Sequence, residues 1–259
     1  PDSPLRVTRS WSVEEGALVL RFALTNGAAT PVEIEGLGMP LIFNNYITDR
    51  TLEQAHAICS FSDPAIGLDA GYVQVTRLTG HGPALLVVPA GRAPLAAYGP
   101  LLDDLTRRTQ TFEGFYEWTT HSRAYAEDEW KGADPWNPPT AATVGPGETR
   151  SYGVRFLLAD SIRSIETTLD KNRRPVAVGI PGYVLPTDLD ASLFLKHSSP
   201  VRSVEVEPQG AIEVAAGDAT VGGWATYRLR GHSWGRARLT VTYEDGLRQS
   251  IHYRVIKPA

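Results

Sequence analysis

An aromatic and acidic stretch between residues 112 and 136 is the part of this sequence best suited to chemistry on a ligand. Its 25 residues hold seven aromatic side chains, and six acidic residues outnumber two basic ones. Aromatic faces stack on the apolar C–H faces of sugar rings, while carboxylates and imidazoles hydrogen-bond the hydroxyl groups. The stretch therefore predicts a carbohydrate contact, with these candidate side chains: Tyr116, Glu117, Trp118, His121, Tyr125, Glu129, Trp130 and Trp136.

The same stretch allows a second interpretation, in which the aromatic rings fix a long loop to its own domain or to a neighbouring one. Alternation typical of a strand runs from Thr109 to Trp118, and the following residues predict a loop. Both interpretations hold together if the loop lies at a domain junction. If Trp118, Trp130 and Trp136 were all buried, the binding hypothesis would lose its main support.

The acidic residues of this stretch do not form a recognisable catalytic pair. Glycoside hydrolysis needs two carboxyl groups about 5–10 Å apart, one of them with a raised pKa. Glu113 and Glu117 lie four positions apart, which in a strand separates them by about 13 Å. A G-x-S-x-G motif at 231–235 is followed by strand-like alternation, whereas a nucleophile elbow needs a helix there. We expect no catalysis by this chain alone.

Metal and cofactor signals are weak. The six histidines are isolated from one another, and no H-E-x-x-H or Cys/His ligand spacing occurs. Carboxylate pairs at 63/69 and 188/190 could contribute to a Ca²⁺ site, but ordinary turn chemistry accounts for them. Gly36 and Gly38 lack the third glycine and the helix of a dinucleotide motif. We expect neither a metal nor a cofactor.

Composition excludes several classes of protein. Of the 259 residues, 42% are hydrophobic, which is too many for a disordered chain, yet no apolar run reaches the roughly 18 residues of a membrane span. The net charge of −4 argues against nucleic acid as a partner. Cys59 is the single cysteine, so no internal disulfide can form, and its apolar neighbours predict a buried thiol.

Most of the elements that must position these residues are predicted strands in an all-β fold. In the first half, residues 6–13 and 17–25 predict a hairpin across the turn Glu14-Glu15-Gly16. Thr51 predicts the N-cap of a short helix. Residues 160–172 predict a longer helix, because apolar side chains repeat at helical spacing and a proline follows: Ile162, Ile165 and Leu169.

A change of pattern near residue 184 predicts two domains. Residues 175–186 are rich in Pro and Gly and predict a linker. Six strand candidates follow at intervals of about ten residues with no helix between them, which is typical of a small immunoglobulin-like sandwich over 187–259. The first domain then covers 1–174 and ends in the predicted helix. Because the linker is apolar, we expect it to lie along the first domain and to fix the second.

Several sequence segments make the chain resemble the β-rich part of a family of large secreted fungal and bacterial proteins. That family is grouped with six-hairpin glycosidases. The resemblance spans nearly the whole chain and rests on these segments: WSVEEGALVLRFALTN, EIEGLGMPLIFNN, LEQAHAICSF, GYVQVTRLTGHGPALLVVP, FEGFYEW, YGVRFLLADSIRSIE and RPVAVGIPGYVLPTDLDASLFLKH. It implies a β-supersandwich over 1–174 and an extracellular location. It also implies an α/α toroid that carries the active site, which this chain is too poor in helices to contain.

Three functions remain open at this point. The first is a non-catalytic β-rich region of a secreted, glycoside hydrolase-like protein that supports a helical toroid domain, in the same chain or a separate one, and contacts glycan. The second is a free-standing carbohydrate-binding protein that uses residues 112–136. The third is a small complete glycoside hydrolase. A helical continuation of the natural reading frame would favour the first.

Overall fold

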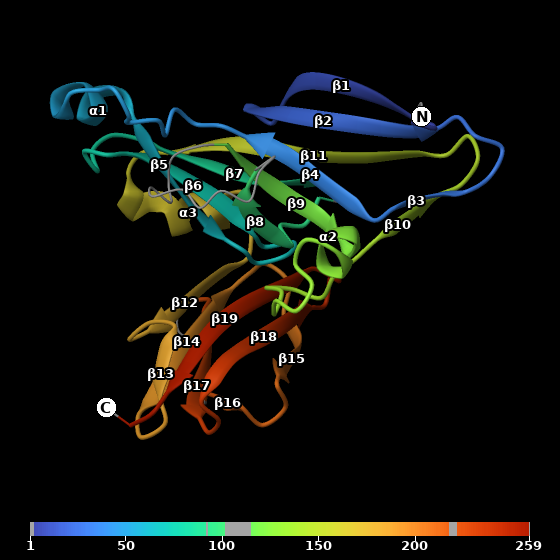
Figure 1. The fold of residues 1–259 in the computed structure, drawn as a ribbon. Helices are drawn as coiled ribbons and strands as arrows, with labels where there is room; N and C mark the ends of the chain where they lie inside the picture. The colour runs from blue at the N-terminus through green and yellow to red at the C-terminus, as the bar shows by residue number, and fades with distance from the viewer. Residues whose placement is uncertain (1–2, 92, 102–114, 218–221, 259) are drawn as a thin grey trace. The chain divides into compact units, whose positions relative to one another are not determined.

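The computed structural model describes residues 3–91, 93–101, 115–217 and 222–258, and it is built mainly from antiparallel β-sheets (Figure 1). The chain divides into two compact units. The first comprises Pro1–Ile66 and Gly71–Ile165, and the second comprises Gly67–Ala70 and Glu166–Ala259. None of the described helices has the length and apolar character needed to cross a membrane.

The first unit contains a six-stranded antiparallel sheet. Its first two strands form the predicted hairpin, with Glu15 and Gly16 at positive φ in the turn. This turn needs a left-handed backbone, which glycine adopts without strain. From one edge to the other, the strands are β1 (Leu5–Glu14), β2 (Ala17–Asn26), β11 (Thr149–Ala159), β7 (Ala84–Gly91), β6 (Tyr72–Arg77) and β5 (Ser60–Ala65).

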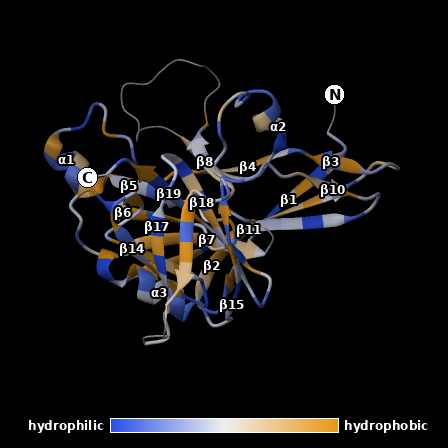
Figure 2. Ribbon diagram, turned by 90° about the horizontal axis from the view of Figure 1, so that it is seen from below, coloured by the Kyte–Doolittle hydropathy of each residue, from blue (hydrophilic) through white to orange (hydrophobic). Residues whose placement is uncertain are grey.

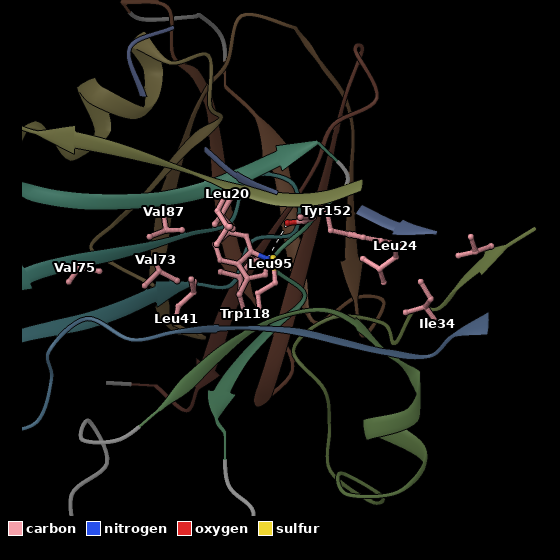
Figure 3. Packing of buried hydrophobic residues seen from close by; sticks show 14 residues of the cluster. Leu20, Leu24, Ile34, Leu41, Val73, Val75, Val87, Leu95, Trp118 and Tyr152 are labelled. Carbon is pink, nitrogen blue, oxygen red and sulfur yellow. Dashed lines mark hydrogen bonds between the residues drawn. The ribbon is translucent and has the colours of Figure 1, made fainter. Parts of the chain in front are cut away.

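A smaller three-stranded sheet packs on the six-stranded one. It consists of β4 (Gly36–Leu41), β9 (Tyr116–Ser122) and β8 (Ala97–Pro100), with β9 in the centre. Side chains from both sheets form one apolar core, in which Trp118 lies among Leu20, Leu41 and Leu95 (Figure 3). A two-stranded ribbon, β3 (Val32–Ile34) with β10 (Ala142–Val144), completes the sheets of this unit.

Helices are short. In α1 (Leu52–Ile58) the Thr51 hydroxyl accepts a hydrogen bond from the Gln54 backbone N–H, which confirms the predicted N-cap. The helix α2 (Arg123–Glu127) follows β9 directly. The predicted continuous helix over 160–172 was too long, because Ser161 is extended and a 3₁₀ turn, η1 (Ile162–Ser164), precedes α3 (Ile165–Lys171).

The second unit consists of two four-stranded sheets around a separate core that includes Leu193, Leu229, Leu239 and Val255. All six strands predicted after residue 187 are present. Apolar and polar residues alternate along strands such as β18 (Figure 2). One sheet has the order β12 (Val176–Ile180), β14 (Asp190–Lys196), β17 (Ala225–Gly231), β16 (Ile212–Ala216), and the other β13 (Val184–Pro186), β19 (Arg248–Ile256), β18 (Gly235–Tyr243), β15 (Val201–Glu207).

The predicted linker at 175–186 is the main correction to the domain organisation. Most of it forms β12 and β13, which pair with β14 and, in parallel, with β19. The segment Gly67–Ala70 also belongs to the second unit. There the backbone N–H of Asp69 donates a hydrogen bond of 3.1 Å to the backbone carbonyl of Arg248. The second unit therefore starts before the predicted linker, at Glu166 in the first turn of α3. It also includes the earlier segment Gly67–Ala70.

Candidate carbohydrate-contacting site

Strand β9 carries the first three candidate side chains, and its pleat divides them between two faces. Successive side chains of a strand point to opposite sides of the sheet. Trp118 therefore lies on one face, and Glu117 and Thr119 lie on the other. The register pairs Trp118 with Met39 of β4 and Tyr98 of β8.

Trp118 belongs to the core. Its side chain is fully buried, and its indole N–H donates a hydrogen bond of 3.1 Å to the carbonyl of Ala93. The ring fills the space between the two sheets, and its indole N–H has a hydrogen-bond acceptor there. The expectation that Trp118 contacts a ligand is thus corrected, because its face of β9 is covered by the six-stranded sheet.

Glu117 lies on the opposite face of β9, where its carboxylate crosses the neighbouring strand β4 at Gly38. A Cβ added at Gly38 would come within 2.1 Å of the Glu117 Oε2 atom. Burial raises the pKa of Glu117 and the nearby charge of Glu129 adds to the rise, while hydrogen bonds from Tyr125 and Thr119 oppose it. The carboxyl group is therefore desolvated but not without partners.

Tyr125 and Trp130 form the aromatic part of the site. Their rings stack with centroids 5.1 Å apart and planes inclined by 20°, and the backbone N–H of Trp130 donates a hydrogen bond of 2.7 Å to the backbone carbonyl of Tyr125. Burial and the charges and hydrogen bond of the nearby carboxylates raise the pKa of Tyr125 to about 12. Its ring packs over Gly36, where an added Cβ would lie 3.4 Å from Cε2.

The structure thus brings four of the eight candidates together: Glu117, Tyr125, Glu129 and Trp130. Trp130 is partly exposed and Glu129 is exposed, whereas Glu117 is buried and hydrogen-bonded to Tyr125. A ring pair with a carboxylate at its rim can stack on a sugar and accept hydrogen bonds from hydroxyl groups. We call these four residues the Tyr125–Trp130 surface.

The other three candidates lie elsewhere. His121 points to the core side, with Nδ1 3.0 Å from the Thr140 hydroxyl and Nε2 3.1 Å from that of Tyr152. Burial, with the charge of Arg150, lowers the pKa of His121 and so favours its neutral imidazole. The ring of Tyr116 stacks on that of Tyr98, with the two ring centroids 5.4 Å apart. The side chain of Trp136 is 45% exposed, at the end of the loop.

Sequence reasoning missed the role of two glycines. In the sequence, Gly36 and Gly38 resemble only a fragment of a dinucleotide motif, yet in β4 they leave room for Tyr125 and for the Glu117 carboxylate. Two glycines at alternate positions in a predicted strand are a usable signal, because such positions often mark close approach by another group. The signal does not say which group approaches.

The remaining sequence motifs carry no chemistry in this fold. The G-x-S-x-G segment forms the connection between β17 and β18, and no helix follows Ser233. Among the described residues, no three His, Cys, Asp or Glu side chains gather as metal ligands. Glu113 lies outside the described residues. Cys59 is fully buried, as predicted, with its Sγ 2.8 Å from the guanidinium of Arg50.

Comparison with known proteins places the whole chain in a family and a fold. The model of a family described as "Family of unknown function (DUF5695)" matches residues 1–259. No curated protein matches the sequence significantly. Among solved structures, a chain described as "Polysaccharide Lyase BACCELL_00875" superposes on 100% of this chain with a TM-score of 0.74 and 14% sequence identity. The matched region is 35% of that longer chain, so this sequence spans about a third of it.

Proposed function

We propose, from the premise that the chain belongs to the DUF5695 family, that it is a non-catalytic β-rich region of a larger carbohydrate-active protein. The observation that carries this proposal is the superposition of both units, over the full chain, on 35% of a polysaccharide lyase chain. A fold that recurs as a fraction of a larger enzyme is best explained as one of its supporting parts. Fold likeness alone does not identify a reaction.

The reaction of the larger protein is proposed to be polysaccharide cleavage by a lyase rather than by a hydrolase. The name of the solved chain favours a lyase, whereas the resemblance to six-hairpin glycosidases favoured a hydrolase. A helical catalytic domain, supplied by the same protein or by a partner, completes the proposal. The first unit would be a supersandwich and the second an immunoglobulin-like module, and the whole protein would be secreted to reach its substrate.

The glycan contact within this chain is proposed at the Tyr125–Trp130 surface. Support comes from a stacked ring pair that is partly exposed and from the exposed carboxylate of Glu129 at its rim. Glu117 has a supporting role, because it is buried and holds the Tyr125 hydroxyl in place. Trp136, exposed at the end of the same loop, is a further candidate contact.

Two measurements test the proposal. The first compares this chain with the full natural gene product in an assay for the ultraviolet absorbance of the double bond that a lyase leaves in its product. We expect product from the full protein and none from this chain. Turnover by this chain alone, lost in Glu117→Gln or Glu129→Gln, would instead make it an enzyme.

The second measurement is binding of this chain to a panel of neutral and acidic polysaccharides by affinity electrophoresis. We expect retardation that Trp130→Ala abolishes and that Trp234→Ala, at an exposed tryptophan of the second unit, leaves unchanged. Retardation together with a natural reading frame lacking helical sequence would favour the second candidate function, a free-standing carbohydrate-binding protein. Equal retardation of Trp130→Ala and the wild type would remove the glycan contact from this surface.

A further inference from the structure

We propose that the outer face of the sheet β12-β14-β17-β16 binds an anionic group of an acidic glycan through the guanidinium of Arg228. The site goes beyond the proposed function, since it lies in the second unit and shares no residue with the Tyr125–Trp130 surface. Its ligand class is a polysaccharide that carries carboxylates or sulfate esters. Register, charge and a surface cavity support it, as follows.

Strand alternation places two arginines of β17 on the outer face of this sheet. Leu229, between them, is fully buried in the core, so Arg228 and Arg230 both point away from it. The neighbouring strands give them different surroundings. Arg230 is paired with Asp190 of β14 and Glu213 of β16, whereas Arg228 is paired with two small residues, Ser192 and Ala215.

Arg230 forms an ion pair with Asp190, whereas Arg228 has no carboxylate directly opposite it in β14 or β16. Nη1 of Arg230 lies 3.2 Å from the Asp190 carboxylate, and Glu213 lies at the same distance from Nε2 of His232. Within the described part of the chain, Arg228 has no ion pair or hydrogen bond to a side chain. A guanidinium with no carboxylate opposite it is free to pair with an anion from solution.

The small residues beside Arg228 also leave a hollow on this face. The cavity has a volume of about 200 Å³ and is lined by Asp190, Glu213, Ala215, Arg228 and Arg230. One water molecule needs only about 10–15 Å³ of such volume, so the hollow accommodates several. It is therefore large enough for a polar group larger than a single ion, and the Arg228 guanidinium forms part of its wall.

The mixture of charges favours a glycan over a small inorganic anion. Two carboxylates, Asp190 and Glu213, line the same cavity and repel a free anion. They accept hydrogen bonds from hydroxyl groups, however, and a sugar residue offers hydroxyls beside its carboxylate or sulfate. Ile180, 54% exposed, pairs with Ser192 on the same row of the sheet and adds an apolar contact for C–H groups.

The test uses the full chain and two variants with the same charge change. Arg228→Gln removes the proposed anion contact. Arg202→Gln is the matched control, because Arg202 is also exposed, lies on the other sheet and pairs with Glu244. Affinities are measured by titration calorimetry at low salt for polygalacturonate, its methyl-esterified form, dextran sulfate and neutral dextran.

We expect the wild type to bind polygalacturonate, dextran sulfate or both, with roughly tenfold weaker binding in Arg228→Gln, since a charge-assisted contact is lost. Arg202→Gln should bind like the wild type, and added salt should weaken binding. Selective binding of polygalacturonate identifies a carboxylate ligand, and selective binding of dextran sulfate identifies a sulfate ester.

Three results would overturn the site: no binding of either anionic polymer, affinity for each anionic polymer no greater than for its uncharged counterpart, or the same affinity change in both variants. Trp130→Ala is measured in parallel. A loss of neutral-glycan binding in Trp130→Ala with no effect of Arg228→Gln refutes only this inference. The reverse pattern refutes only the contact at the Tyr125–Trp130 surface.

Discussion

The carboxylate of Glu117 occupies the space that a side chain at Gly38 would fill. Oε2 lies 2.1 Å from the position that a Cβ of residue 38 would take. The glycine in β4 and the acid in β9 are therefore matched, although 79 positions separate them in the sequence (117 minus 38). This pairing explains why the Tyr125–Trp130 surface has a buried carboxyl beneath its aromatic rings.

The Gly38–Glu117 relationship predicts that Gly38→Ala destabilises the chain. The added methyl forces the end of the Glu117 side chain away and breaks its hydrogen bond with Tyr125, so we expect a loss of about 1–3 kcal/mol in the free energy of unfolding. Urea denaturation measures it. Gly99→Ala is the control, because no heavy atom of the described residues beyond its chain neighbours lies within 4 Å of its added Cβ, and an equal loss there would refute the pairing.

The raised pKa of Glu117 predicts a pH-dependent stability. Because the folded state disfavours the charged carboxylate, the folded pKa exceeds the ordinary value of 4.5, and the unfolded chain ionises first. The free energy of unfolding should therefore fall as pH rises from 4.5 through the folded pKa. Glu117→Gln removes this dependence, so the difference between wild type and variant should change with pH in that window. A difference that stays constant contradicts the burial of the charge.

Tyr125→Phe should raise the pKa of Glu117 further. The Tyr125 hydroxyl donates to the carboxylate and favours its ionised form, and the variant removes that donor while leaving the ring stack with Trp130. Titration of the carboxyl ¹³C resonance by NMR measures the shift directly. A lower pKa in the variant would show that the hydroxyl does not stabilise the carboxylate.

Packing of the helical segment predicts a contrast between two apolar residues. Leu169 in α3 is 1% exposed, so Leu169→Ala should lower the free energy of unfolding by about 2–5 kcal/mol. Ile162 in η1 is 41% exposed, and Ile162→Ala should have a much smaller effect. Urea unfolding compares them. Similar losses in both variants would mean that the segment packs differently.

Burial of the single thiol predicts slow modification. Cys59 is 0% exposed, so a thiol reagent should label the native chain only through opening of the structure, and labelling should become rapid in denaturant. Absorbance of the released chromophore measures the rate. Labelling of the native chain at the rate seen in denaturant would contradict the buried position beside Arg50.

Local patterns in the sequence predicted much of the secondary structure. The hairpin at Glu15 and Gly16, the N-cap at Thr51 and the six strands after residue 187 depend on neighbouring residues, because turn conformation, capping and alternation act over a few positions. The buried positions of Leu169 and Cys59 were likewise predictable from apolar neighbours. Each of these features needs no knowledge of a distant partner.

Strand pairing decided the rest, since it joins residues far apart in the chain. Alternation puts Glu117 and Trp118 on opposite faces, but only the packing of the six-stranded sheet makes the Trp118 face the core. Residues 175–186 were predicted as a linker because Pro and Gly are frequent there, and their pairing with β14 and β19 makes them strands. Arg228 has no carboxylate directly opposite it because the register places Ser192 and Ala215 there, and no local pattern in the sequence determines a register between distant strands.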